Sequence, residues 1–203
     1  HCSWYPLRVL SEAHLPVMLH ESHLEQLRRR HCRNGLFKKL NVKTFNSSGF
    51  SIGRLRVEPF EVAHQPGFRT FGYKITFRSQ NAWKKAVVVS DLNNGLELTD
   101  LFSETDFIYL ESNHDLELLK LNPNPNSRFH MSNPATARLL ADIRKKSKKP
   151  PQAVMLGHLS EHRNEADIAL GQMHDTFIKE GLDLDFPLVP APLYAASETI
   201  TIN

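Results

Sequence analysis

Four polar side chains that could bind a metal or carry a proton stand at the ends of predicted β-strands. His64 ends the segment FEVAH, Asp91 ends VVVSD, Glu111 ends FIYLE and His158 ends AVMLGH. Sheets that contain parallel strands deliver the residues at their carboxyl ends to one edge, where the sites of such sheets usually lie. We therefore expect these four side chains to meet at a common rim.

Two histidines and an aspartate at one rim form a ligand set with a defined metal preference. Imidazole and carboxylate ligands suit zinc, manganese or iron, and a carboxylate can bridge two ions. A single His64 or His158 would more often be a hydrogen-bonded histidine at a sheet edge, so the prediction depends on their placement together with Asp91. The residues by themselves predict a metal site and do not specify a reaction.

The composition limits the classes of protein to consider. The chain has 203 residues, 40% of them hydrophobic, with 25 basic and 22 acidic side chains and two cysteines. This length favours one globular domain over residues 1–203. The charge permits a polyanionic partner but lacks the dense basic stripe of a dedicated nucleic-acid-binding protein. Because no disulfide framework, long apolar run or signal-peptide pattern is evident, we expect a cytoplasmic protein without a membrane segment.

Hydrophobic periodicity predicts the elements that would position the candidate residues. The expected strands cover 16–20, 51–63, 72–77, 84–90, 107–110 and 153–156. The expected helices cover 21–31, 98–103, 135–146 and 165–179. Pro59 predicts a break or bulge within its strand, and the polar segment 78–83 suits a hairpin. An antiparallel meander followed by alternating strands and helices indicates an α/β fold of mixed sheets covered by helices.

The order of five segments resembles the metallo-β-lactamase superfamily. The segments are FEVAHQPGFRTFGYKI, VVVSDL, DFIYLESNHDLELL, FHMSNPATARLL and VMLGHLSEHRNEADIAL. Within the superfamily, ESNHD, HMSN and GHLS are similar to the YycJ-type branch of small hydrolases, which is associated with 5′ exonuclease activity on DNA. The similarity keeps its order and spacing from about residue 1 to about residue 175. It implies an αββα sandwich of two mixed sheets flanked by helices, with the N-terminal strands missing or truncated.

The resemblance also implies metal-binding roles for individual residues. His64 would belong to the first metal site, Asp91 would bridge two ions, and His158 would be the last ligand of the second site. His1 lies near the place of the final histidine in the family signature HxHxDH, and the rest of that motif is absent from the chain. Either the upstream segment is missing from this sequence, or the fold has lost its first motif and serves as a non-catalytic scaffold in a larger assembly. The expected cofactor is a pair of divalent metal ions, with zinc as first choice and manganese or iron as alternatives.

The implied reaction is hydrolysis of a phosphodiester, in nucleic acid or in a small molecule, by a hydroxide that two metal ions activate. Asp91 and His130 are the catalytic candidates, with His130 contacting the phosphate or assisting the leaving oxygen. His114, Ser132 and Asn133 are expected to line the substrate site, and a helix-capping role is the alternative for Asn133. Hydrolysis of a thioester or lactone at the same site is the alternative reaction, because a fold alone does not choose between these substrates.

Overall fold

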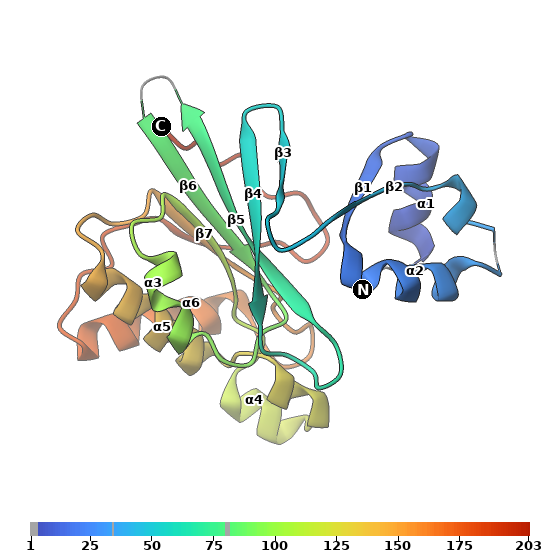
Figure 1. Cartoon of the computed structure of the whole chain (residues 1–203). Helices are drawn as coiled ribbons and strands as arrows, with labels where there is room; N and C mark the ends of the chain where they lie inside the picture. The colour runs from blue at the N-terminus through green and yellow to red at the C-terminus, as the bar shows by residue number, and fades with distance from the viewer. Residues whose placement is uncertain (1–3, 34, 80–81) are drawn as a thin grey trace. The chain divides into compact units, whose positions relative to one another are not determined.

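The computed structural model describes residues 4–33, 35–79 and 82–203, and the chain divides into two compact units, residues 1–50 and 51–203 (Figure 1). The elements of the first unit are α1 (Trp4–Glu12), β1 (Pro16–His20), the 3-10 helix η1 (Glu21–His23), α2 (Leu24–His31), the 3-10 helix η2 (Phe37–Lys39) and β2 (Asn41–Phe45). The predicted strand at 16–20 and the helical segment at 21–31 are confirmed. A single domain over 1–203 stays a prediction.

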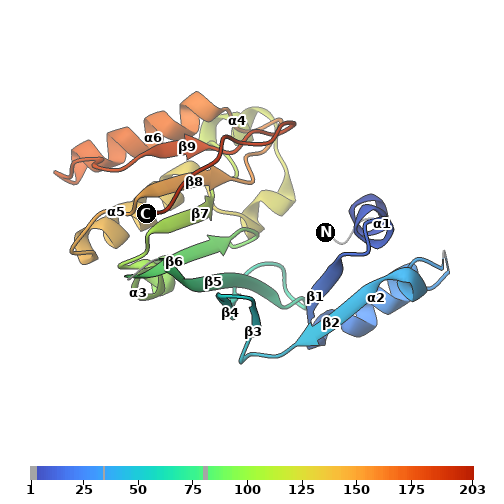
Figure 2. The ribbon, with the colours of Figure 1, turned by 90° about the horizontal axis from the view of Figure 1, so that it is seen from above.

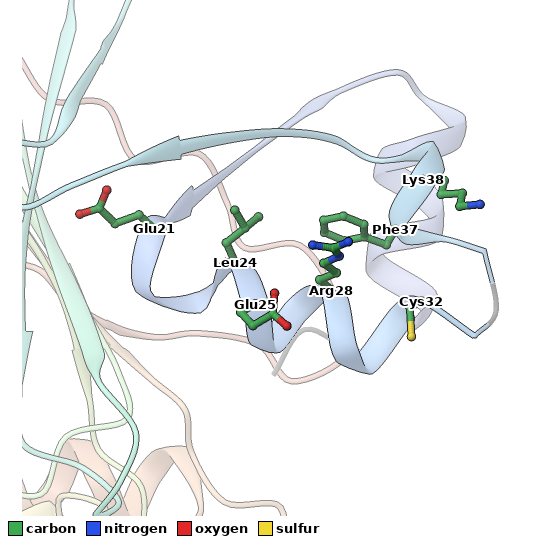
Figure 3. A pocket seen from close by; sticks show the side chains of 7 residues that line it. All are labelled: Glu21, Leu24, Glu25, Arg28, Cys32, Phe37 and Lys38. Carbon is green, nitrogen blue, oxygen red and sulfur yellow. The ribbon is translucent and has the colours of Figure 1, made fainter.

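The first unit is built around a small apolar core. Strands β1 and β2 pair in parallel from Pro16 opposite Asn41 to His20 opposite Phe45. The core consists of four leucines from α1, β1, α2 and the segment before η2, namely Leu7, Leu19, Leu27 and Leu36. Beside it lies a hollow of about 600 Å³, lined by the side chains in Figure 3: Glu21, Leu24, Glu25, Arg28, Cys32, Phe37 and Lys38. This hollow contains none of the four strand-end residues.

The second unit is a seven-stranded mixed sheet with helices. Its strands, listed as neighbours in the sheet, are β3 (Phe50–Ile52), β4 (Leu55–Val62), β5 (Thr70–Ser79), β6 (Ala82–Val89), β7 (Phe107–Glu111), β8 (Ala153–Gly157) and β9 (Leu188–Pro190) (Figure 2). The helical elements are η3 (Leu96–Leu98), α3 (Thr99–Phe102), α4 (Leu116–Leu121), η4 (Pro125–Phe129), α5 (Asn133–Lys146) and α6 (Ala166–Lys179). The predicted α/β fold with a mixed, helix-covered sheet is confirmed.

Alternation along the central strands determines which face of the sheet the helices cover. Val87 on β6, Ile108 on β7 and Val154 on β8 occupy the same row of the register, and all three are fully or almost fully buried. They belong to one apolar core together with residues of α3, α5 and α6, among them Phe102 and Phe177. Because side chains alternate between faces along a strand, these helices cover one face of the sheet and fix its central strands in place.

The prediction of a break at Pro59 was wrong. Strand β4 runs through Pro59, which pairs with Tyr73 on β5. The other neighbour of β4 is β3, which has only three residues. Proline has no N–H to donate, so it can be accommodated in the middle of β4 where its nitrogen faces the side that has no partner strand among the described residues. The predicted hairpin is present, since β5 and β6 pair antiparallel from Tyr73 opposite Val88 to Ser79 opposite Ala82.

The sequence predicts that the chain has no membrane segment, and the length and polarity of the helices can be compared with that prediction. Among the described residues, no helix combines the length and the apolar character that crossing a bilayer requires.

Candidate metal centre

Four strands bring their carboxyl ends to one edge of the sheet. β5 is antiparallel to both β4 and β6, while β7 and β8 run parallel to β6. His64 follows β4, Asp91 follows β6, Glu111 is the last residue of β7 and His158 follows β8 directly. The register sets Glu111 beside Gly157, the residue before His158. The sheet topology therefore places the strand-end residues along a single rim.

Two of these residues leave their strands in an uncommon backbone conformation. Asp91 has φ = 56° and His158 has φ = 53°. Left-handed backbone is uncommon outside glycine, although aspartate and histidine adopt it more readily than most residues, and it costs of the order of 1–3 kcal/mol. Such conformations persist where surrounding contacts hold them, and they cluster at functional sites. Here they follow the last residues of β6 and β8, Val89 and Gly157, by two residues and one residue.

Glu111 is the organising carboxylate of the rim. Its side chain is fully buried, with 0% exposure. Oε1 lies 3.0 Å from Nδ1 of His130 and accepts a hydrogen bond from the amide of Met131 at 2.9 Å. Oε2 lies 2.8 Å from Nδ1 of His158 and accepts a hydrogen bond from the amide of Asp91 at 2.5 Å. One carboxylate thus ties together the ends of three strands and the segment before α5.

These contacts fix the tautomers of three histidines. A carboxylate only accepts hydrogen bonds, so His130 and His158 each carry a proton on Nδ1, and in the neutral form of each ring the lone pair is on Nε2. Nδ1 of His64 lies 2.8 Å from the carbonyl oxygen of Phe129, which has the same consequence. The ring of His130 lies 4.9 Å from that of His64 and 5.0 Å from that of His158, measured between centroids. Three imidazoles oriented through Nδ1 by oxygen acceptors are the arrangement that metal-binding histidines usually show.

Asp91 adds a second carboxylate to the cluster. Its Oδ1 lies 3.6 Å from Nδ1 of His158 and 3.8 Å from Nδ1 of His130. Ligand atoms of Asp91, Glu111, His130 and His158 all lie within 4.8 Å of one another, close enough to hold a metal ion. Because both oxygens of Glu111 already accept hydrogen bonds, we assign it to orientation. The imidazole nitrogens and the oxygens of Asp91 fit zinc and similar divalent ions.

The electrostatics of the cluster keep Glu111 ionised. Burial opposes the charged form, but hydrogen bonds from His130 and His158 and the charges of both rings outweigh it and lower the pKa of Glu111 below its ordinary value. The pKa of His158 is raised, chiefly by its hydrogen bond to Glu111, against the opposing effect of burial. Orientation of the ligands therefore depends on Glu111 remaining a carboxylate.

The residues expected to line the substrate site lie beside this cluster but differ in exposure. His114 is 5% exposed, and Ser132 is the N-cap of α5. The side chain of Asn133 is directed into the interior, where it bonds to Ser112 and Asn164 at 2.7 and 2.9 Å. The backbone amide of Asn133 donates a hydrogen bond to the carbonyl oxygen of His114 at 2.8 Å. Asn133 therefore positions the start of α5, and a direct substrate contact from its side chain is not supported.

The structure brings Asp91, His130 and His158 together with Glu111. His64 is not in this group of four and lies next to it, 4.9 Å from His130 between ring centroids. His1 lies outside the described residues. The roles of these residues as ligands and catalysts stay predictions. Sequence reasoning placed Glu111 at the rim but gave it no role, and its only signal was its position at a strand end. The buried amide network of Asn133 and Asn164 was missed, because hydrogen bonds across 31 positions leave no local pattern.

The chain has the metallo-β-lactamase fold, as comparison with solved structures shows. No protein-family model and no curated protein sequence matches the chain. The metallo-β-lactamase fold protein YhfI from Bacillus subtilis has a similar structure, with a TM-score of 0.64 and 16% sequence identity over 92% of this chain and 68% of that protein.

Two further solved structures have the same fold. Unliganded yeast PDE1 is similar with a TM-score of 0.60 and 16% identity, over 88% of this chain and 58% of that one. A diphosphatase from the PhnP family is similar with a TM-score of 0.58 and 13% identity, over 92% and 62% of the two chains. The chain thus spans about three fifths of the length of these two structures. At such low identity the likeness concerns the fold.

Proposed function

We propose that the protein is a metal-dependent hydrolase that cleaves phosphodiesters in nucleic acid or in a small molecule, and that it belongs to the YycJ-type branch. The observation that carries the proposal is the rim cluster: the imidazoles of His130 and His158 lie beside the carboxylate of Asp91, His64 lies next to His130, and each ring is oriented through Nδ1 by an oxygen acceptor. Structural similarity to a diphosphatase of the PhnP family supports a phosphorus-containing substrate. The segments ESNHD, HMSN and GHLS support the branch.

We separate the metal ligands from the group that acts on the substrate by asking which of them line the neighbouring pocket. His64, Asp91 and His158 would hold two divalent ions, which supply a hydroxide near neutral pH and positive charge for the phosphoryl oxygens. His130 lines a pocket of about 460 Å³ on the same unit, whereas His64 and His158 do not. We therefore assign His130 to the substrate, where its imidazolium form would donate the Nε2 proton to the leaving oxygen and become the neutral ring that keeps its proton on Nδ1. The other ring nitrogen of His130, Nδ1, forms a hydrogen bond with the carboxylate of Glu111.

Replacing His130 with alanine tests this division of roles. Loss of a general acid typically costs about 10²- to 10⁴-fold in rate. The loss should be greatest for a dinucleotide, whose leaving alkoxide needs a proton, and much smaller for bis(p-nitrophenyl) phosphate, whose nitrophenolate leaves without one. Initial rates on both substrates, measured for wild type and for His130→Ala at equal metal content, give the comparison.

His174 provides the matched control, because it is exposed on α6 and contacts none of the cluster residues that the structure describes. His174→Ala should hydrolyse both substrates at the wild-type rate. Equal losses of His130→Ala on the two substrates would remove His130 from proton transfer. Hydrolysis of a thioester or lactone with no turnover of either phosphodiester would replace the proposed substrate class with the alternative one.

A further inference from the structure

The positive charge of the chain is concentrated in the first unit. Residues 1–50 carry eight Lys/Arg and three Asp/Glu side chains, a formal charge of +5, whereas residues 51–203 carry 17 and 19, a formal charge of −2. The overall charge of +3 therefore conceals a basic first unit and a weakly acidic second one. Such an uneven division of charge is typical of proteins that bind nucleic acid or a membrane surface through one of their parts.

Most of this charge lies in residues 28–43, which we call the basic segment. It comprises the second half of α2, the 3-10 helix η2 and the first part of β2, and it contains seven Lys/Arg and no Asp/Glu residues. A dense group of cations that face the solvent attracts a polyanion. All seven are exposed: Arg28, Arg29, Arg30, Arg33, Lys38, Lys39 and Lys43.

The acidic residues of the first unit neutralise little of this charge. Glu25 pairs with Arg29 at 2.9 Å. Glu12 pairs with Arg8, which lies outside the basic segment. The other six cations of the basic segment have no carboxylate partner among the described residues. Their charges can therefore bind the phosphates of a ligand without first breaking an ion pair.

The basic run at the end of α5, in the second unit, shows the opposite situation. Residues 144–149 contain five Lys/Arg residues, and carboxylates of the same unit pair with four of them. The pairs are Arg144 with Asp185, Lys145 with Glu180, Lys146 with Asp100 and Lys149 with Asp106. The density of cations along the sequence is higher in this run, but most of its charge is neutralised. It is therefore the appropriate comparison for the basic segment.

The hollow in Figure 3 gives the basic segment a concave surface. Arg28 lines it from α2, and Phe37 and Lys38 line it from η2. Phe37 is half-buried. In proteins that bind single-stranded nucleic acid, bases stack on aromatic rings and neighbouring cations bind the phosphates. Because Glu21 and Glu25 line the hollow at the start of α2, the phosphates would bind at the other end, between Arg28 and Lys38.

A membrane surface suits the basic segment less well than nucleic acid does. A basic helix that binds a membrane also presents apolar side chains, which insert among the lipids. None of the described residues of the basic segment is an exposed large hydrophobic one. The leucines of α2 and of the segment before η2, Leu27 and Leu36, are buried in the core of the first unit. The surface thus has the charge that phosphates require and lacks the apolar contacts that lipids require.

We propose that the first unit binds single-stranded nucleic acid through the basic segment, with phosphates at Arg28 and Lys38 and a base against Phe37. The inference concerns binding alone and requires neither a metal ion nor cleavage, so it goes beyond the proposed function. It assigns the chain a nucleic-acid partner and a surface for it that includes none of the residues of the metal centre.

The test measures binding of the full chain to a fluorescently labelled single-stranded DNA of about 20 nucleotides by fluorescence anisotropy, with EDTA present to prevent cleavage. For wild type, the logarithm of the association constant should fall linearly with the logarithm of the salt concentration. The variant Arg28→Gln/Lys38→Gln/Lys39→Gln should bind about tenfold or more weakly at low salt. Its salt slope should be smaller by about two, because each cation contact contributes about 0.7 on a single strand.

The control variant is Lys145→Gln/Lys146→Gln/Lys148→Gln, which removes the same charge from the basic run of the second unit. It should keep the affinity and the salt slope of wild type, and circular dichroism checks that both variants are folded. Equal weakening by the two variants would attribute binding to net charge and would overturn the proposal. A wild-type chain that binds vesicles of phosphatidylserine and phosphatidylcholine but not the DNA would also overturn it, in favour of a membrane surface. Because cleavage is not measured, neither result depends on the hydrolase activity.

Discussion

Asp91→Asn should lower the rate of phosphodiester hydrolysis by about 10³-fold or more. The substitution keeps the shape of the side chain but removes the negative charge that would hold two cations together. The loss of metal-derived charge stabilisation is worth several kcal/mol, and each 1.36 kcal/mol is about tenfold in rate. Because the amide N–H of Asp91 still donates to Glu111, we expect the fold to survive. Steady-state kinetics and thermal unfolding of the same preparation separate the two effects.

Asp100 is the control for this experiment, since its side chain is 76% exposed on α3. Asp100→Asn should retain the wild-type rate. A rate within about threefold of wild type for Asp91→Asn would show that this carboxylate does not hold the reacting metal ions.

Glu111→Gln should have the largest effect on stability. The amide cannot accept all four hydrogen bonds that Glu111 accepts from His130, Met131, His158 and Asp91. Breaking a buried ion pair by removing one partner costs about 3–5 kcal/mol. Urea unfolding of the metal-free full chain, compared with wild type, gives the difference in unfolding free energy. Metal affinity should also fall, by about 10- to 100-fold, because Glu111 orients two imidazoles.

The pH dependence of this difference follows from the two pKa shifts. The pKa of Glu111 is lowered from 4.5 in the fold, so its contribution is present above pH 4.5 and is lost as the pH falls through the lowered value. The pKa of His158 is raised from 6.5, so its contribution is present below pH 6.5 and is lost as the pH rises through the raised value. The destabilisation by Glu111→Gln should therefore be greatest between pH 4.5 and 6.5.

Glu117 is the control, because it is an exposed glutamate that pairs with Lys120 on the same helix. Glu117→Gln should change the unfolding free energy by at most about 0.5 kcal/mol, as expected for a surface pair. A difference for Glu111→Gln that does not vary with pH would show that the charge of Glu111 does not stabilise the cluster.

The strands that position the site could be predicted from local sequence patterns, because each of them is a clear apolar run. The apolar runs before Asp91, Glu111 and His158 indicate buried strands, and the polar residue that ends each run marks the rim. In the structure β6, β7 and β8 lie side by side in parallel. The placement of these three residues on one rim could thus be derived from the order of the strands alone.

Contacts between distant segments could not be predicted from the sequence. The hydrogen bonds of Glu111 to His130 and His158 span 19 and 47 positions, and that of His64 to the carbonyl of Phe129 spans 65. The tautomers of three histidines depend on these contacts. The effect of Pro59 on its strand could not be predicted for the same reason. It depends on which side of β4 has a partner strand, and the sequence around Pro59 does not show this.

Metal analysis of the purified protein shows whether His64 and His158 hold metal ions together with Asp91. Elemental analysis by mass spectrometry, after loading with zinc and removal of loosely bound ions, should find at least about one equivalent per chain in wild type and in His174→Ala. His64→Ala and His158→Ala should each lose most of that metal while remaining folded. Wild-type protein that retains no metal, or His64→Ala and His158→Ala proteins that retain as much as wild type, would contradict the claim.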